Sequence, residues 1–209
     1  MSNISEAKLA LQQLIEGNLR FAANLRNKQP LASSKRAELI DGQEPFAVIV
    51  GCSDSRVPAE IVFDQGLGDL FVIRVAGNIV APSQVGSVEF AISRFKTKLV
   101  VVLGHSNCGA INSTIDELLH GANNDSVNIK SIVDRVKPAV QGLMCGAAHM
   151  DIATLQDQAV RANVRASVQH LKTGSTILER AVLNDNLLIV GAEYSLETGI
   201  VDFFDGVPD

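Results

Sequence analysis

Four short and nearly continuous runs of apolar residues are spaced along the chain, at positions 46–50, 70–75, 99–103 and 187–190. An unbroken apolar run predicts a strand that is covered on both faces, because a strand with one solvent-facing side alternates instead. Such strands are typical of parallel sheets. A fifth segment, 200–204, follows a turn-rich stretch and is predicted to pair antiparallel at an edge of the sheet.

Helical patterns separate most of these strands. Apolar side chains recur there at spacings of three and four residues, which is the period of an α-helix with one buried face. The predicted helices cover residues 82–95, 110–120, 126–140, 151–172 and 175–183. Because strands that alternate with helices form right-handed crossovers, the sequence predicts an α/β fold. We expect a central, mainly parallel four-stranded sheet with an antiparallel edge strand, flanked by helices.

An N-terminal helical arm precedes the first strand. Its residues 5–26 carry one apolar stripe at helical spacing, formed by Leu11, Leu14, Ile15, Phe21, Ala22 and Leu25. The next segment is polar and is interrupted by prolines and a glycine, which leaves room for at most a short helix over 33–40. A chain of 209 residues can bury one substantial core and does not require a second. We therefore expect a single domain over 1–209, with the arm and its connection over 1–45 and the α/β core over 46–209.

One aromatic residue lies off the apolar stripe of its helix. The core positions of helix 82–95 are Val85, Val88, Ala91, Ile92 and Phe95. Phe90 projects about 150° away from the centre of that stripe. It is either an ordinary exposed phenylalanine or part of a subunit interface or pocket wall. The N-terminal helix, which must also dock on some surface, favours association between copies of the chain.

Composition and charge argue against several classes of protein. The longest apolar runs are far shorter than the roughly 20 residues of a membrane-spanning helix, so no membrane association is expected. The N-terminus lacks the basic and apolar regions of a signal peptide, which predicts a cytoplasmic location. The formal net charge is −5, and the lysines and arginines are scattered along the chain, which argues against binding to nucleic acid.

The three cysteines indicate chemistry rather than disulfide bonds. An odd number cannot all pair with one another, and a cytoplasmic setting keeps thiols reduced. Cys52 comes directly after the first buried strand, and His105 and Cys108 come directly after the third. Because ligands gather beyond the carboxyl ends of parallel strands, these side chains are expected to converge. Two thiolates and an imidazole suit Zn²⁺, and three protein ligands leave one coordination position open.

The occupant of that fourth position decides what the site does. A water molecule there would have its pKa lowered from about 15.7 toward 7, which gives a hydroxide nucleophile at neutral pH. Asp54, two residues after Cys52, could instead close the shell as a fourth ligand. A bidentate pair with Arg56 would hold the carboxylate off the metal, keep it ionised and direct its free oxygen to the bound water.

Two other interpretations of this cluster stay open, a closed structural zinc site and a redox pair of thiols. The first would leave Asp54 and Arg56 unexplained, and the chain has no Cys-x-x-Cys pair. The second is not supported, because the two cysteines lack the local arrangement of a thioredoxin-like pair. The glycines within 65–68 predict a tight turn rather than a nucleotide site. The remaining candidates are predicted to be ordinary surface, capped or buried residues: Cys145, His120, His149 and His170.

At these positions the sequence closely resembles the β-class carbonic anhydrases. The resemblance covers most of the chain, in the family's order, and is carried by the stretches 51–58, 69–78, 104–110 and 191–199. It implies a carbonate dehydratase, in which hydroxide on zinc attacks carbon dioxide and forms bicarbonate and a proton reversibly. It also implies one Zn²⁺ per subunit on Cys52, His105 and Cys108, with Asp54 and Arg56 acting as described above.

The resemblance further implies a pocket for carbon dioxide and bicarbonate beside the metal. Gln43 stands where plant-type members place a substrate-binding glutamine, and Gly109 stands where the family offers a backbone N–H. Phe71, Ala76 and Phe90 match apolar positions of the pocket wall, although Ala76 is smaller than the family's frequent valine. In this family the pocket lies at a dimer interface, so the resemblance implies a homo-oligomer, either a dimer or a dimer of dimers.

A subgroup of the family has a regulatory bicarbonate site with a tryptophan three residues before the first zinc-binding cysteine. That position is Ile49 in this chain, which contains no tryptophan. We therefore predict no such regulatory site, and an open zinc shell at neutral or alkaline pH. Two rival functions remain open. One is hydrolysis of a related substrate, carbon disulfide or carbonyl sulfide, on the same scaffold, and the other is a non-catalytic zinc protein.

Overall fold

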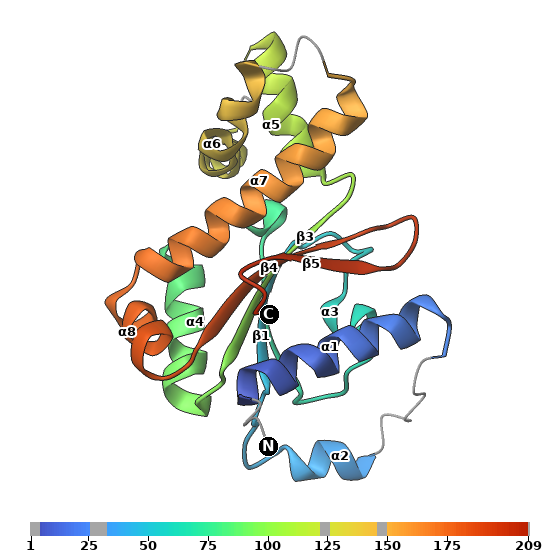
Figure 1. The fold of residues 1–209 in the computed structure, drawn as a ribbon, viewed down its shortest axis with the longest axis vertical. Helices are drawn as coiled ribbons and strands as arrows, with labels where there is room; N and C mark the ends of the chain where they lie inside the picture. The colour runs from blue at the N-terminus through green and yellow to red at the C-terminus, as the bar shows by residue number, and fades with distance from the viewer. Residues whose placement is uncertain (1–4, 26–32, 122–125, 146–149, 209) are drawn as a thin grey trace.

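The computed structural model describes residues 5–25, 33–121, 126–145 and 150–208. Its centre is a five-stranded sheet with the strand order β2-β1-β3-β4-β5 (Figure 1). The strands are β1 (Ala47–Gly51), β2 (Leu70–Arg74), β3 (Leu99–His105), β4 (Leu188–Tyr194) and β5 (Val201–Asp205). The first four strands are parallel, and β5 pairs antiparallel with β4. This topology confirms the predicted α/β sheet with its antiparallel edge strand.

The helices after β2 begin and end close to where the apolar pattern predicts. The described α-helices are α1 (Glu6–Ala22), α2 (Ser33–Glu38), α3 (Ala59–Val62), α4 (Pro82–Phe95), α5 (Gly109–His120), α6 (Val127–Gln141), α7 (Ile152–Thr173) and α8 (Thr176–Asn184). Polar side chains fix the starts of α6, α7 and α8. Ser126, Asp151 and Ser175 each accept a hydrogen bond from the backbone N–H three residues later.

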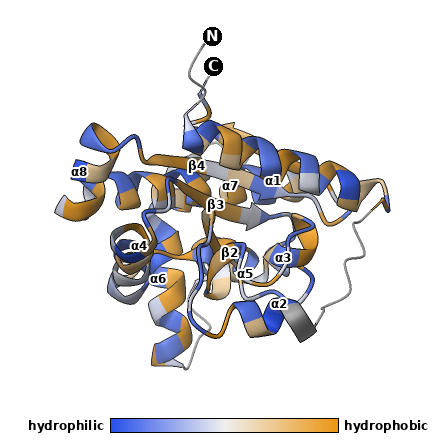
Figure 2. Ribbon diagram, turned by 90° about the horizontal axis from the view of Figure 1, so that it is seen from below, coloured by the Kyte–Doolittle hydropathy of each residue, from blue (hydrophilic) through white to orange (hydrophobic). Residues whose placement is uncertain are grey.

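Helices cover both faces of the sheet, as its continuous apolar strands require (Figure 1). Alternate residues of a strand point to opposite faces, and the two faces carry separate cores. On one face, Ile49 and Val101 belong to a core with α1 and α3. On the other face, Val48 and Val100 belong to a core with α4, α7 and α8. Figure 2 shows the same division, with hydrophobic strands inside and helices of mixed hydropathy around them.

A third core lies beyond the carboxyl ends of the strands. There α5, α6 and part of α7 pack together at one end of the molecule (Figure 1). Ile111 of α5, Val136 of α6 and Val160 of α7 are buried in it. Cys52 and Cys108 belong to the same core. The predicted metal ligands therefore lie where this helical unit meets the ends of the central strands.

The N-terminal helix docks on the sheet of its own chain. Its apolar stripe is buried in the core on that face. Asn18 is buried and donates from Nδ2 to the carbonyl oxygens of Val62 and Gly199, which joins α1 to α3 and to the connection between β4 and β5. Gly17 permits this contact, because a β-carbon there would overlap the carbonyl oxygen of Phe63.

Two strands run further than their apolar pattern predicts. β3 continues past Gly104 to His105, and β4 continues past Gly191. A glycine normally weakens a strand. Here, however, α7 lies so close to the sheet that β-carbons added at Gly104 and Gly191 would lie 2.6 Å and 2.7 Å from the side chain of Val164. Helix packing therefore requires both glycines, and no local pattern reveals this.

The shortest helical segments are not evident in the sequence pattern. They are α3 and the 3₁₀ turns η1 (Ala76–Asn78) and η2 (Gly142–Cys145). Segments of one turn are too short to show a period. Within the described ranges, no helix combines the length and the apolar character needed to cross a membrane.

Candidate metal centre

The three predicted ligands meet where β1 and β3 end. Cys52 follows β1, His105 is the last residue of β3, and Cys108 is the N-cap residue of α5. Because β1 and β3 are parallel neighbours, their carboxyl ends lie side by side. The two Sγ atoms are 4.0 Å apart, and the three ligand atoms lie within 4.8 Å of one another. All three side chains are buried. The fold thus assembles the group that could hold a metal ion.

The tautomer of His105 follows from its surroundings. Its Nδ1 lies 2.9 Å from the carbonyl oxygen of Ser106, and only an N–H can hydrogen-bond to a carbonyl, so Nδ1 carries the proton. Nε2 then presents a lone pair. It is buried and has no hydrogen-bond partner among the residues that the structure describes. A buried polar atom without a partner costs free energy, and a metal ion is the partner that this donor set fits.

The two thiols of the cluster share one proton. A hydrogen bond with Cys108 lowers the pKa of Cys52 to about 4 against the opposing effect of burial, and backbone N–H groups lower this pKa further. The same hydrogen bond and burial raise the pKa of Cys108. One thiolate is therefore present at neutral pH. A divalent cation would displace the shared proton and pair with both sulfurs.

Arg56 holds Asp54 beside the ligands. The Nε and Nη2 atoms of Arg56 donate to Oδ1 and Oδ2 of Asp54 at 2.9 Å and 2.7 Å, and its backbone N–H donates to Oδ1 at 2.9 Å. These hydrogen bonds hold the pKa of Asp54 well below its usual range, so the carboxylate is ionised at neutral pH. Oδ2 also lies 3.9 Å from Nε2 of His105. The bidentate pair expected from the sequence is present, and its acidic member lies next to the ligand cluster.

A second arginine holds the backbone of the ligand loop. Arg74 ends β2 and donates from Nε to the carbonyl oxygen of Cys52 at 3.0 Å. Its Nη2 donates to the carbonyl oxygen of Asp54 at 2.6 Å. The register of β1 and β2 pairs Arg74 with Gly51, which brings the guanidinium to this loop. Sequence reasoning assigns Arg74 no role, and its one local signal is a charged residue inside an otherwise apolar strand.

The turn between His105 and Cys108 is fixed by contacts on both sides. Asn107 has a left-handed backbone with φ 53°, a conformation that asparagine tolerates better than most residues. Its carbonyl oxygen accepts a hydrogen bond from Arg56 at 3.3 Å. The turn delivers Cys108 to the N-terminus of α5, where the helix dipole favours a thiolate.

Two of the predicted pocket residues lie beside the ligands. Ala76 begins the turn η1, whose next residue, Gly77, donates its N–H to Sγ of Cys52 at 3.3 Å. Gly109 directly follows Cys108 as the first residue of α5. The N–H groups of a first helical turn have no acceptor within the helix and are free for a ligand. Both residues therefore have the positions that the predicted pocket needs, and their roles stay predictions.

The other three predicted pocket residues lie toward the opposite end of β1. Gln43 precedes β1, and Phe71 pairs with Val48, four residues before Cys52. At about 3.3 Å per residue, this places Phe71 roughly 13 Å back along the strands from Cys52. The rings of Phe90 and Phe71 lie together, with centroids 6.3 Å apart. Within one chain, these residues do not line the ligand cluster.

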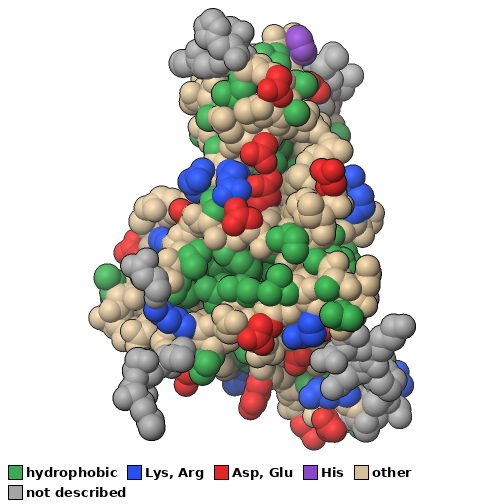
Figure 3. All heavy atoms as spheres, turned by 45° about the vertical axis from the view of Figure 1, so that its right-hand side comes forward, with side chains coloured by type: hydrophobic (Ala, Val, Ile, Leu, Met, Phe, Trp, Pro, Cys, Tyr) green, Lys and Arg blue, Asp and Glu red, His purple; other side chains and the backbone are tan. Residues whose placement is uncertain are grey.

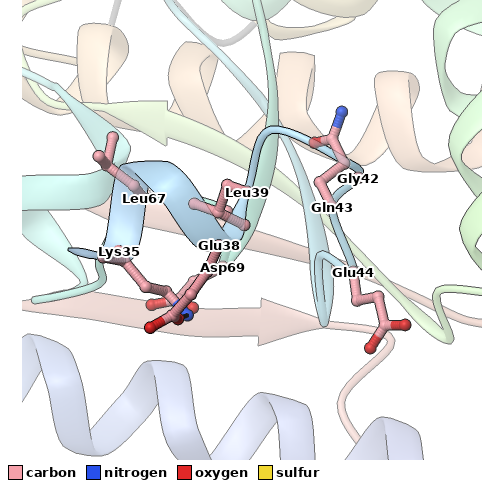
Figure 4. Close-up of a pocket in the computed structure, with 9 residues that line it drawn as sticks. Lys35, Glu38, Leu39, Gly42, Gln43, Glu44, Leu67 and Asp69 are labelled. Atoms are coloured by element: carbon pink, nitrogen blue, oxygen red, sulfur yellow. Dashed lines mark ion pairs between the residues drawn. The ribbon is translucent and has the colours of Figure 1, made fainter. Parts of the chain in front are cut away.

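Gln43 and Phe90 both lie on the outside of the chain. Gln43 lines a cavity of about 540 Å³ between α2 and the residues 67–69. In Figure 4 its side chain points away from Lys35 and Asp69, which line the same cavity. Phe90 is 55% exposed, which confirms that it lies off the core stripe of its helix.

The two remaining candidates that the structure describes add no ligand to the cluster. His120 and His170 are exposed in the last turns of α5 and α7. His149 and the side chain of Cys145 lie outside the described residues. The glycines within 65–68 do form a turn, in which the N–H of Gly66 donates to Asp69.

Known proteins match this chain over most of its length. The family model described as carbonic anhydrase matches residues 47–201. A carbonic anhydrase of Mycolicibacterium smegmatis is 39% identical over 198 residues, which cover 92% of this chain and 91% of that protein. Carbonic anhydrase 2 of Mycobacterium tuberculosis is 37% identical over 190 residues, which cover 91% and 89%. The match to the family model includes the whole ligand cluster and the Asp54–Arg56 pair.

Solved structures share the fold. The β-carbonic anhydrase of Coccomyxa, in complex with acetazolamide, is 27% identical with a TM-score of 0.74, and 93% of this chain and 86% of that chain are covered. The β-carbonic anhydrase CafA of Aspergillus fumigatus is 21% identical with a TM-score of 0.73, and covers 95% and 92%. The second likeness concerns the fold alone. Sequence and fold thus point to one family.

Proposed function

Because this chain belongs to the β-class carbonic anhydrases and is therefore a carbonate dehydratase, we propose that it works with one zinc ion per subunit, held by Cys52, His105 and Cys108. The observation that carries this proposal is Nε2 of His105. It is buried, it has no hydrogen-bond partner among the described residues, and it belongs to a group whose ligand atoms lie within 4.8 Å of one another. Two thiolates and an imidazole suit zinc, and three protein ligands leave one position for chemistry.

The chain itself supplies orientation and charge for the hydration of carbon dioxide. Zinc in this site would lower the pKa of a water molecule from about 15.7 to near 7 and so supply hydroxide at neutral pH. Asp54 accepts a hydrogen bond from this hydroxide and so turns an oxygen lone pair toward carbon dioxide. Each carboxylate oxygen has two acceptor sites, so Oδ2 can accept from Arg56 and from the hydroxide together. Arg56, bonded to both oxygens, keeps Asp54 from becoming a fourth ligand.

The substrate pocket is proposed to lie between η1 and the start of α5. Ala76 contributes an apolar wall for carbon dioxide, which has no net charge and few hydrogen-bonding needs. Gly109 offers a backbone N–H to an oxygen of bicarbonate, at a helix terminus that favours anions. Arg74 holds the carbonyl oxygens of the ligand loop and so keeps Asp54 in position for both substrates.

We propose that a second copy of the chain completes this pocket. Three predicted pocket residues lie near the start of β1, too far from its end to line the cluster of their own chain: Gln43, Phe71 and Phe90. Phe90 is nevertheless 55% exposed and so available to a partner. Exposed apolar surface of this kind marks an interface. On the side of the molecule that lies to the right in Figure 1, away from α4, Figure 3 shows further hydrophobic side chains gathered across the middle of one face. In a two-fold dimer each subunit would offer these three residues to its partner's metal centre.

Mixing two inactive variants tests this arrangement. One chain carries His105→Ala and lacks a metal site, and the other carries Gln43→Ala and lacks the donated amide. If Gln43 acts across the interface, half of the dimers in an equal mixture are hybrids with one intact site. The mixture should then reach about a quarter of the parent activity after co-refolding, above the mean of the two variants measured separately. If Gln43 acts within its own chain, the mixture stays at that mean.

The proposal includes a cytoplasmic location and the absence of bicarbonate regulation. A reducing compartment keeps Cys52 and Cys108 as the free thiols that metal binding needs. Ile49, which stands at the position of the regulatory tryptophan, is fully buried in the core beneath α1.

Stopped-flow hydration of carbon dioxide, on protein of measured zinc content, is the test of the proposed function. Turnover should rise in proportion to bound zinc, disappear when a chelator removes the metal, and return when Zn²⁺ is added back. Carbon disulfide and carbonyl sulfide are assayed beside it. Hydrolysis of either without hydration of carbon dioxide would favour the rival substrate. Stoichiometric zinc without turnover on any of them would favour a non-catalytic zinc protein.

A further inference from the structure

A buried chain of hydrogen bonds joins α7 to the sulfur of Cys52. Asn163 of α7 donates from Nδ2 to the carbonyl oxygen of Gly77 at 2.9 Å. The N–H of Gly77 in turn donates to Sγ of Cys52 at 3.3 Å. One turn further along α7, Ser167 donates from Oγ to the carbonyl oxygen of Asn78 at 3.3 Å. Asn163 and Ser167 are 3% and 6% exposed, so both hydrogen bonds are shielded from water.

The turn η1 has a backbone that needs to be held in place. Gly77 has φ 69° and Asn78 has φ 44°, so two successive residues are left-handed. This conformation is unfavourable for most residues with a β-carbon, although asparagine tolerates it better than others. A β-carbon at residue 77 would lie only 3.0 Å from that of Ala110, so glycine lets η1 pack against α5. This conformation directs the N–H of Gly77 at the sulfur, and the two α7 side chains bind the carbonyl oxygens on its other side.

We propose that Asn163 is a positioning residue for the metal centre. It holds Gly77 so that the N–H of Gly77 hydrogen-bonds to the Cys52 thiolate, and this bond orients the sulfur and strengthens zinc binding. Outer-shell partners of metal ligands act in this way, and their loss lowers metal affinity. Ser167 supports the same turn through the longer bond to Asn78 and has the smaller effect. The inference rests on the zinc site proposed above.

A purely structural Asn163 would do no more than satisfy the buried carbonyl oxygen of Gly77. Its loss would then destabilise the fold without a specific effect on the metal. Metal affinity and stability must therefore be measured separately, and a control must lower stability without touching η1. Val168 lies on α7 and is 1% exposed, in the core between α7 and the sheet. Val168→Ala is the matched control.

The first measurement is zinc affinity, by competition with a chromophoric chelator, beside the melting temperature of the metal-free protein. Asn163→Ala should lower the affinity about tenfold to a hundredfold, and Ser167→Ala should lower it less. Val168→Ala should lower the melting temperature through its cavity and leave the affinity within about twofold of the parent. An affinity within about twofold for Asn163→Ala, or an equal loss for Val168→Ala, would overturn the inference.

The absorption spectrum of the Co²⁺-substituted protein is a second measurement, which a change in the stability of the fold alone does not affect. In Co²⁺-substituted Asn163→Ala the thiolate-to-cobalt charge-transfer band should shift to longer wavelength, because the sulfur loses a hydrogen bond that lowers the energy of its lone pairs. Val168→Ala should keep the band of the parent, and an unmoved band in Asn163→Ala would overturn the inference. If Asn163→Ala does not fold, Ser167→Ala decides: a zinc affinity more than about twofold below that of the parent supports the inference, and an affinity within about twofold overturns it. If the unmodified protein binds no zinc at all, that result would instead contradict the proposed function.

Discussion

A His105→Ala protein is expected to lose its zinc and, with it, nearly all hydration of carbon dioxide. Structural zinc sites of four ligands bind with about 10–16 kcal/mol in total, so one ligand contributes roughly 3 kcal/mol, or about a hundredfold in affinity. Asp54 does not replace the lost ligand, because Arg56 is bonded to both of its oxygens. Zinc content after dialysis against a weak chelator, followed by the stopped-flow assay, measures both effects.

His120→Ala is the control for the loss of a histidine. His120 is exposed at the end of α5, and its removal should leave zinc content and turnover at the parent level. A melting curve of each metal-free protein shows whether the fold persists, since His105 is fully buried. One retained equivalent of zinc in His105→Ala would contradict the assignment of this residue as a ligand.

Asp54→Asn should keep the metal and lose about a hundredfold or more of the turnover, which is the usual contribution of a positioned acid–base group. Asparagine has nearly the same shape, but its amide presents one acceptor oxygen in place of two and carries no charge to pair with Arg56. Raising the pH should not restore the rate of the variant, because the amide cannot ionise. In the parent, hydrogen bonds from Arg56 lower the pKa of Asp54, so its carboxylate is already ionised at neutral pH. The stopped-flow rate per bound zinc is the measurement.

Two further variants separate the role of Asp54 from a general effect of charge. Asp134→Asn removes a carboxylate that pairs with Lys130 at 2.9 Å on α6, and it should leave the rate per zinc unchanged. Arg56→Ala should also be slow, because Asp54 is then free to approach the metal and close the open position. Full activity in Asp54→Asn would refute its orienting role, and unchanged activity in Arg56→Ala would refute the role of Arg56 in keeping Asp54 off the metal.

The strands and the longer helices after residue 46 follow closely from the sequence, because each depends on its own residues. Continuous apolar runs predict buried parallel strands, and β1 to β4 are those strands. Side chains that cap a helix act within one turn, so Ser126, Asp151 and Ser175 mark their helices locally. The ligand trio is also predictable, since the carboxyl ends of neighbouring parallel strands must lie together.

The rest depends on contacts between segments that are far apart in sequence. Arg74 reaches the ligand loop through strand register, and Asn163 reaches Gly77 across 86 residues. Neither pairing has a periodic or spacing signal. The position of Gln43 is a different case, because resemblance assigned it to the pocket while the single chain places it before β1. A residue that acts in a partner's site, as we propose for Gln43, carries no sign of this in its own sequence.

The close packing of α7 on the sheet limits how this enzyme can be engineered. Replacing glycine by alanine at a compatible site stabilises a protein by about 0.4–1 kcal/mol, because the unfolded chain loses freedom. At Gly104 and Gly191 the same change would push against Val164 and lift away the helix that carries Asn163. A stabilising library should spare these two positions and begin instead at Gly142 after α6, where the backbone is right-handed helical (φ −63°, ψ −26°) and an added β-carbon would have no neighbouring side chain within 4 Å.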